Sequence, residues 1–201
     1  TTTLIYGINH TAFDRKKHVL VSAASCTTTG LAHMVKPLLD HEETSTILTA
    51  SMSTIHAVTN SQSVLDKLPK AGEKDIRKTR SILNNIILTS TGAAKALIEV
   101  IPEVKNIGFM GDSIRVPTNT LSLIVLNVTF QAKLNGKGNA ANIDTKKLND
   151  IYRKAAESNP EKLIRFTMEQ NVSTVLIGED AAIIIEGDFN HTRTAFIPVD
   201  L

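Results

Sequence analysis

The sequence contains one cysteine and no tryptophan, and aromatic residues make up only 4% of its 201 residues. A single cysteine cannot form an internal disulfide and is too few for a thiolate metal site, so no metal is expected. Few aromatic side chains are available to stack on bases, and the formal charge of +2 is too small to indicate a polyanion partner. A nucleic-acid partner is therefore not expected.

Long hydrophobic runs are also lacking. No apolar stretch approaches the roughly 20 residues that a bilayer span needs, and the N-terminus shows none of the features of a signal peptide. We therefore expect a cytoplasmic protein without a membrane partner. A hydrophobic content of 42% and a charged content of 21% are typical of an ordinary globular domain, and one domain over residues 1–201 is the default at this length.

The sequence also lacks the motif that binds a dinucleotide cofactor. The sequence contains no strand-Gly-x-Gly-x-x-Gly-helix unit, which is the fingerprint of a dinucleotide-binding half. A nucleotide-binding Rossmann domain is thus absent from these residues. Any nicotinamide cofactor would have to be bound elsewhere.

Hydrophobic periodicity predicts many strands and few helices. Helices are predicted after Cys26, over 91–102 and over 144–157. Strands are predicted at 19–21 (short and buried), 46–58, 107–116, 121–131, 163–166, 172–177, 183–185 and 194–199, with a long loop over 59–88 and a polar connector at 135–139. This order favours an α+β fold with a mostly antiparallel or mixed sheet covered by a few helices.

Cys26 is the first candidate for chemistry. A lone cysteine is more often a small buried hydrophobe than a reactive group. However, Ser25 and the threonines after Cys26 are typical of a helix start, and the dipole at a helix N-terminus favours the thiolate. His56 is predicted to end a strand, and its imidazole would activate the thiol if the two elements pack together. The spacing alone does not establish that contact.

Four motifs follow one another along the chain: Ser25-Cys26-Thr27-Thr28, Thr54-Ile55-His56-Ala57, Ser90-Thr91-Gly92-Ala93-Ala94-Lys95-Ala96 and Ile114-Arg115-Val116-Pro117-Thr118. Together they strongly resemble the catalytic domain of glyceraldehyde-3-phosphate dehydrogenase. The resemblance covers residues from about 19 to 128, and beyond Gln131 only the pattern of helix and strands agrees. It implies a glycolytic oxidoreductase of the cytoplasm that uses NAD or NADP and assembles as a homotetramer.

The resemblance also implies roles for individual residues. Cys26 would attack the aldehyde of glyceraldehyde 3-phosphate, with His56 as the base, and the resulting Cys26 thioester would be cleaved by inorganic phosphate to give 1,3-bisphosphoglycerate. The attacking phosphate would be held by Ser25, Thr27, Thr91 and Gly92, and the substrate phosphate by Thr59 and Arg115. Hydroxyls and backbone N–H groups at helix starts bind oxyanions, and an arginine fork suits phosphate.

Alternatives stay open at this point. Thr91 could simply cap a helix, Arg115 could form an ion pair, and Thr59 could only begin the loop. The segments 60–66 and 77–80 are more similar to those of erythrose-4-phosphate dehydrogenase, which is one alternative function. The related semialdehyde dehydrogenase chemistry is a second alternative. A non-catalytic interaction domain with the same fold is a third. Because the family's nucleotide-binding domain and closing helix lie outside these residues, we expect little dehydrogenase activity from them alone.

Overall fold

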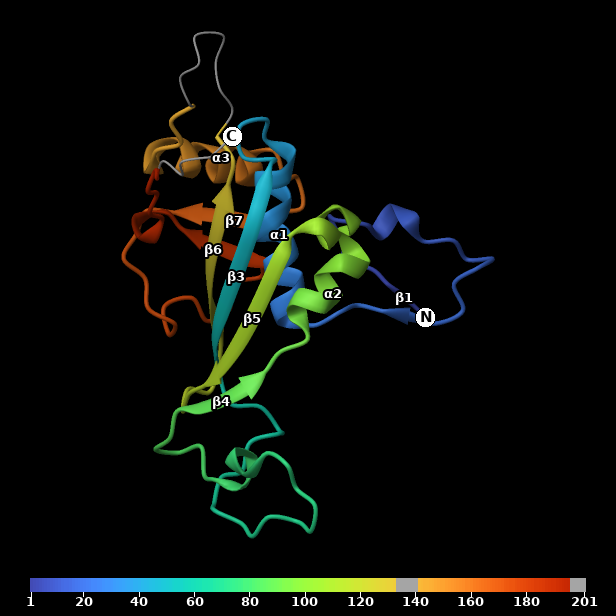
Figure 1. The fold of residues 1–201 in the computed structure, drawn as a ribbon, viewed down its shortest axis with the longest axis vertical. Coiled ribbons are helices and arrows are strands. Elements are labelled where there is room, and N and C mark those ends of the chain that lie inside the picture. The colour runs from blue at the N-terminus through green and yellow to red at the C-terminus, as the bar shows by residue number, and fades with distance from the viewer. Residues whose placement is uncertain (133–140, 196–201) are drawn as a thin grey trace, which may run out of the picture.

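The computed structural model describes residues 1–132 and 141–195, which fold around one central sheet (Figure 1). The strands are β1 (Thr2–Thr3), β2 (Val21–Ser22), β3 (Ile47–His56), β4 (Ile87–Ser90), β5 (Gly108–Arg115), β6 (Ser122–Phe130), β7 (Ile164–Thr167) and β8 (Ile183–Glu186). The helices are α1 (Cys26–Asp40), α2 (Ala93–Val100) and α3 (Thr145–Glu157), with 3₁₀ turns at His10–Ala12, Ile76–Thr79, Pro102–Asn106 and Gly187–Phe189. The fold is α+β with mixed sheets, as the sequence predicts.

The central sheet has four strands in the order β4-β5-β3-β6. β3 runs parallel to β5 and antiparallel to β6, and β4 runs antiparallel to β5. Alternate residues of β3 point to opposite faces. Ala50, Met52 and Thr54 are buried on the face that the helices cover, and their neighbours Ser51 and Ser53 are only partly buried on the other face.

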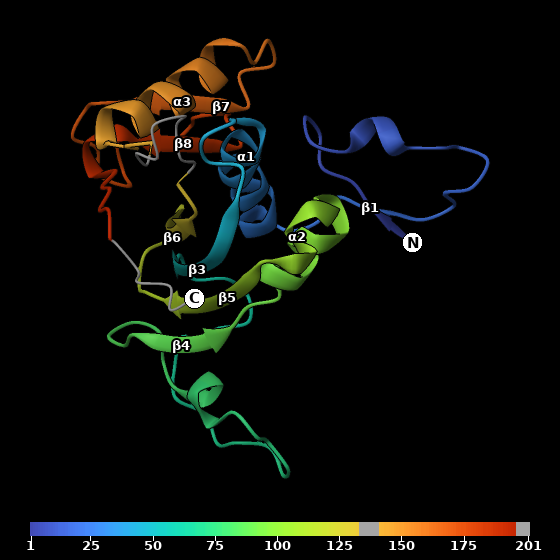
Figure 2. The ribbon, with the colours of Figure 1, turned by 45° about the horizontal axis from the view of Figure 1, so that its top comes forward.

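Helix α1 lies against the sheet and forms the centre of the core (Figures 1 and 2). Leu31, Val35 and Leu38 recur at helical spacing and are almost fully buried, so one face of α1 packs against the sheet and α2. The predicted helix after Cys26 is present in full. Its apolar face, rather than its polar N-terminus, fixes its position in the fold.

A second layer is formed by α3 and the β7–β8 pair. Asp144 caps α3 by accepting a hydrogen bond from the Lys147 backbone N–H at 2.8 Å, as the sequence predicts. Ile151 and Tyr152 are buried, and the Tyr152 hydroxyl donates to the Met34 carbonyl at 3.0 Å. This bond joins α3 to α1 directly. Burial raises the pKa of the Tyr152 phenol, so that it stays protonated and remains a donor.

Three strand predictions need correction. The sequence predicts a buried strand at 19–21, but Val19 is 97% exposed and β2 covers only Val21–Ser22, because its partner β1 is just two residues long. Residues 172–177 form no strand, because they belong to the crossover that connects the parallel strands β7 and β8. Strand β4 lies at the end of the segment over 59–88 that the sequence predicts as a loop.

Two predicted segments cannot be compared in full. The connector at 135–139 lies outside the described residues, as does most of the strand predicted at 194–199, whose described residues Thr194 and Ala195 are not in a strand. No helix in the described part of the chain is both long and apolar enough to cross a membrane.

Candidate active site

The N-terminus of α1 presents Cys26 at the surface. Ser25 is the N-cap residue, and its hydroxyl accepts a hydrogen bond from the Thr28 backbone N–H at 3.2 Å. Ser25 Oγ also lies 2.8 Å from Thr28 Oγ1. Ala24, just before the cap, adopts a left-handed conformation with φ of 61°, which a residue with a Cβ rarely does. The turn and the cap together place the exposed Cys26 in the first turn of the helix.

His56 and Arg115 come from two adjacent parallel strands. They are register partners at the C-terminal ends of β3 and β5, so their side chains project from the same face of the sheet. That face is the one that α1 covers. Behind the pair, the Thr54 hydroxyl donates a hydrogen bond to Ser113 Oγ at 2.9 Å, and both residues are buried. This bond ties the two strands together next to the two side chains.

The thiol and the imidazole are in contact. Cys26 Sγ lies 3.4 Å from His56 Nε2, which is within hydrogen-bonding range for sulfur. The other ring nitrogen, Nδ1, lies 2.8 Å from the carbonyl oxygen of Ala57. The imidazole is therefore oriented between the sulfur and a backbone acceptor, an arrangement typical of an activated thiol.

Arg115 completes this cluster. Its Nη1 lies 2.6 Å from His56 Nδ1 and donates to the Ala57 carbonyl at 3.0 Å. Its Nε is buried and has no hydrogen-bond partner among the described residues. The guanidinium is thus only partly satisfied and retains capacity for an anionic oxygen.

The remaining predicted residues are less closely connected to the thiol. Thr27 is buried, and its hydroxyl lies 4.0 Å from Cys26 Sγ. Thr59 is exposed and its hydroxyl bonds to Ser61 and Gln62. Thr91 accepts from the Ala93 backbone N–H at 3.2 Å, and Gly92 is the N-cap of α2. Within residues 1–132 and 141–195, none of Thr59, Thr91 and Gly92 bonds to Cys26, His56 or Arg115.

Several residues that orient the side chains of the candidate site carry no recognisable signal in the sequence. Thr28 fixes the Ser25 hydroxyl, the Ala57 carbonyl orients His56, and Gln62 holds both the backbone N–H and the hydroxyl of Thr59. The carbonyl of Ala57 carries no side-chain signal at all. Gln62 and Thr28 stand inside runs of polar residues, where nothing distinguishes them from their neighbours.

The described part of the chain lacks a Gly-rich dinucleotide turn and a cluster of metal-ligating side chains. No Gly-rich turn joins a strand to a helix in this part of the chain, and the turn before α1 is made instead by Ala24 with Ser25 as the cap. No group of three metal-ligating side chains is found among the same residues. The candidate site is therefore a thiol, an imidazole and a guanidinium.

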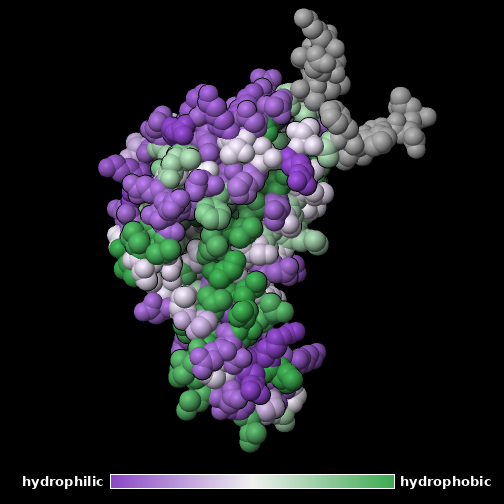
Figure 3. Space-filling view, turned by 90° about the vertical axis from the view of Figure 1, so that its left-hand side faces the viewer, coloured by the Kyte–Doolittle hydropathy of each residue, from purple (hydrophilic) through white to green (hydrophobic). Residues whose placement is uncertain are grey.

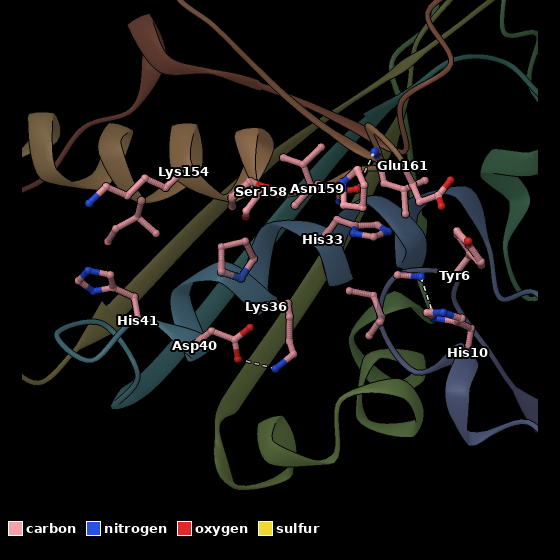
Figure 4. A pocket seen from close by; sticks show the side chains of 18 residues that line it. Tyr6, His10, His33, Lys36, Asp40, His41, Lys154, Ser158, Asn159 and Glu161 are labelled. Carbon is pink, nitrogen blue, oxygen red and sulfur yellow. Dashed lines mark hydrogen bonds and ion pairs between the residues drawn. The ribbon is translucent and has the colours of Figure 1, made fainter.

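A second region with unusual polar chemistry lies away from Cys26. A cavity of about 700 Å³ is bordered by the N-terminal segment, α1 and α3, and its lining includes Tyr6, His33, Lys36, Asp40 and Lys154 (Figure 4). His33 is 1% exposed, and its Nε2 is buried without a partner in the part of the chain that the structure describes. Burial lowers the pKa of His33, opposed by a weaker effect of a hydrogen bond to the Tyr6 backbone. None of the predicted site residues lines this cavity.

Comparisons with known proteins identify a family for most of the chain. Residues 25–196 match the family model described as glyceraldehyde 3-phosphate dehydrogenase, C-terminal domain. The chain is 36% identical over 184 residues to glyceraldehyde-3-phosphate dehydrogenase 1 of Bacillus cereus, covering 92% of this chain and 50% of the relative. Identity to glyceraldehyde-3-phosphate dehydrogenase of Kitasatospora aureofaciens is 32% over 197 residues, or 98% of this chain and 54% of the relative. The chain thus spans about half the length of these relatives.

Proposed function

The chain belongs to the glyceraldehyde 3-phosphate dehydrogenase C-terminal domain family, and on this premise we propose that it supplies the nucleophile and the base of a phosphorylating aldehyde dehydrogenase. The substrate is glyceraldehyde 3-phosphate and the product is 1,3-bisphosphoglycerate. The hydride acceptor is NAD or NADP, bound mainly by a domain that residues 1–201 do not include. One observation carries the proposal: Cys26 Sγ lies 3.4 Å from a histidine that is oriented by a backbone carbonyl and contacted by an arginine.

Cys26 and His56 perform the first step. His56 Nε2 takes the thiol proton, and the sulfur adds to the aldehyde carbon to form a C–S bond. The imidazole then gives this proton to the former carbonyl oxygen, and a hemithioacetal results. Oxidation of this adduct to a thioester is the chemistry that the nicotinamide supplies when it is bound. When the adduct is oxidised, His56 accepts the proton of its hydroxyl group.

The proposal assigns two phosphate sites to this chain. Arg115 and Thr59 bind the phosphate of the substrate, because the guanidinium has an unused donor and phosphate accepts from arginine in a fork geometry. Ser25, Thr27, Thr91 and Gly92 bind the inorganic phosphate, whose oxygen attacks the thioester carbon and releases Cys26 as the thiolate. Both α1 and α2 begin at these residues, and helix starts favour anions.

Alkylation of Cys26 by iodoacetamide tests the activated thiol. Because the chain has one cysteine, the rate reports on this sulfur alone. In phosphate buffer we expect the parent to react faster at neutral pH than a free thiol, and His56→Asn to slow the reaction by about a hundredfold, as for loss of a general base. His18→Asn removes a histidine remote from the thiol and should react like the parent. Equal rates for His56→Asn and the parent would instead support a non-catalytic interaction domain.

The open face of the central sheet supports a homo-oligomer as part of this proposal. Met110, Leu123, Leu88 and Val125 are 72%, 56%, 55% and 42% exposed, and all four point away from the helices by register. A space-filling view shows hydrophobic side chains gathered in a band along one face of the molecule (Figure 3). Sedimentation should detect an assembly that Met110→Lys weakens and that Val172→Lys, at an exposed residue of the crossover between β7 and β8, leaves unchanged.

A further inference from the structure

Two contacts at one nitrogen of His56 require opposite protonation states. Nδ1 lies 2.6 Å from Arg115 Nη1 and 2.8 Å from the Ala57 carbonyl oxygen. A guanidinium only donates, so Nδ1 must be without a hydrogen to accept from Arg115. A carbonyl only accepts, so Nδ1 must carry a hydrogen to bond to Ala57. His56 can therefore satisfy only one of these partners at a time.

The choice at Nδ1 determines what Nε2 can do to the Cys26 thiol. A neutral imidazole carries one hydrogen. If Arg115 donates to Nδ1, that hydrogen is on Nε2, which faces Sγ and cannot take the thiol proton. If Nδ1 donates to Ala57, Nε2 has a free lone pair and can take it. Only the second tautomer is a base toward Cys26.

Arg115 also lacks a full set of partners where it stands. Its Nε is buried without an acceptor, and its Nη1 donates to a neutral ring and a carbonyl. Charge-assisted bonds from arginine to phosphate are roughly twice as strong as neutral ones and are often bidentate. An anion beside Arg115 therefore competes well against the imidazole for the guanidinium.

We propose that Arg115 holds His56 in the tautomer that cannot act as a base, and that a phosphate-class anion draws the guanidinium away and lets Nδ1 donate to Ala57. During the exchange, water removes one hydrogen from Nε2 and another is added to Nδ1. The thiol proton then moves to Nε2. No bond between heavy atoms changes, and no oxidant is required. The inference rests on the proposed function and makes Arg115 a positioning residue as well as a phosphate ligand.

The pH dependence of thiolate formation follows from the two tautomers. With Nδ1 bound to Ala57, the thiol proton is kept on the imidazole, so the thiolate forms without losing a proton to solvent. With Arg115 on Nδ1, the proton must leave for solvent, which requires a higher pH. In the described part of the chain, the charged or titratable groups in contact with His56 are Cys26 from α1 and Arg115 from β5. Its register partner on β6, Ser122, does not titrate in this range.

Nuclear magnetic resonance of the ¹⁵N-histidine-labelled chain tests the tautomer directly. The His56 signals are identified by their loss in His56→Asn. We expect the hydrogen on Nε2 in a chloride buffer and on Nδ1 after addition of inorganic phosphate at equal ionic strength. The ratio of the two tautomers should change by at least about tenfold, the size expected for one charge-assisted hydrogen bond. The same tautomer in both buffers would overturn the proposal.

Ultraviolet absorbance of the Cys26 thiolate provides a second test of the proposal, and it needs no reagent bound in the site. We expect phosphate to shift the appearance of the thiolate to lower pH in the parent. Arg115→Met has no donor, and should show the Nδ1 tautomer and the lower-pH thiolate in chloride alone, with no further response to phosphate. A response to phosphate that persists in Arg115→Met would overturn the proposal, because the anion would then act through another group.

The two proposals fail in different ways. If His56→Asn leaves the thiol as reactive as in the parent, the proposed function fails. If His56→Asn slows the thiol but phosphate changes neither the tautomer nor the thiolate, only the role of Arg115 as a positioning residue is wrong. Should Arg115→Met not fold, the magnetic resonance measurement on the parent still decides the question.

Discussion

Two histidines on the helix-covered side of this molecule have opposite surroundings. His56 has partners at both ring nitrogens and faces an exposed thiol. His33, inside α1, is 1% exposed and leaves Nε2 without a partner. The proposed reactivity of Cys26 therefore rests on how His56 is oriented beside an exposed thiol. The buried histidine near the cavity of Figure 4 contributes to packing, and burial disfavours its charged form.

The packing around His33 gives the largest expected effect. Gly7 has φ of +80°, and an added Cβ would lie 2.6 Å from Leu163 Cδ1 and 3.0 Å from His33 Cε1. We expect Gly7→Ala to lower the free energy of unfolding by about 3 kcal/mol through strain and overpacking. Denaturant unfolding measures this loss, and the alkylation rate of Cys26 in the folded chain should not change.

Gly72 is the matched control for that substitution. Its φ is +81°, but an added Cβ would have no atom within 4 Å. Gly72→Ala should therefore cost only the backbone strain, about 1 kcal/mol. Equal losses for the two variants would show that the His33 region is not tightly packed, and the contrast between the two histidines would weaken.

The second prediction concerns stability against pH. The lowered pKa of His33 means that, below the ordinary value of 6.5, the unfolded chain binds a proton that the folded chain does not. Stability should therefore fall as pH decreases from 6.5 toward the folded pKa, with a slope of up to about 1.4 kcal/mol per pH unit. Unfolding in denaturant at several pH values should show a flatter curve for His33→Leu. An unchanged curve would mean that His33 does not titrate differently in the folded chain.

Local features of the site can be predicted from the sequence, whereas the contacts between its parts cannot. The start of α1 depends on Ser25 and on apolar spacing within a few residues, so the sequence correctly predicts Cys26 at a helix N-terminus. The contact of His56 with Arg115 depends on the parallel register of β3 and β5, which are far apart in the chain. Composition and spacing carry no information about that register.

The errors in predicting the fold from the sequence have the same origin. Residues 172–177 have a strand-like composition, yet the parallel pairing of β7 with β8 requires a crossover and this segment provides it. Strand β4 is four residues long and pairs only with β5, so its signal is lost within a long polar loop. The roles of Thr59, Thr91 and Gly92 remain predictions from family resemblance.

The third prediction separates helix stability from reactivity at Cys26. Ser25→Ala removes the N-cap of α1 and should cost about 1 kcal/mol of unfolding free energy. Because the cap also fixes the first turn, we expect slower alkylation of Cys26 as well. Asp144→Ala removes the corresponding cap of α3 and should cost a similar amount without changing alkylation. A change in rate for both variants would indicate a general loss of structure instead.

The smallest expected effect comes from the strained residue before the cap. Ala24 has φ of 61°, a conformation that glycine adopts without a Cβ penalty. Relief of this strain in Ala24→Gly is offset in part by the greater entropy of the unfolded chain, so the net gain should be at most about 1 kcal/mol. Lys162→Gly, at φ of 53°, should change the free energy of unfolding by a similar amount.

Ala24→Gly and Lys162→Gly should differ in the alkylation rate of Cys26 if the turn at Ala24 positions the nucleophile. A flexible glycine at position 24 allows the first turn of α1 more freedom, so Ala24→Gly should slow alkylation while Lys162→Gly should not. A stabilised Ala24→Gly with parental reactivity would show that the Ser25 cap alone holds the thiol against His56. A destabilised Ala24→Gly would show that the left-handed turn is not a source of strain in the folded chain.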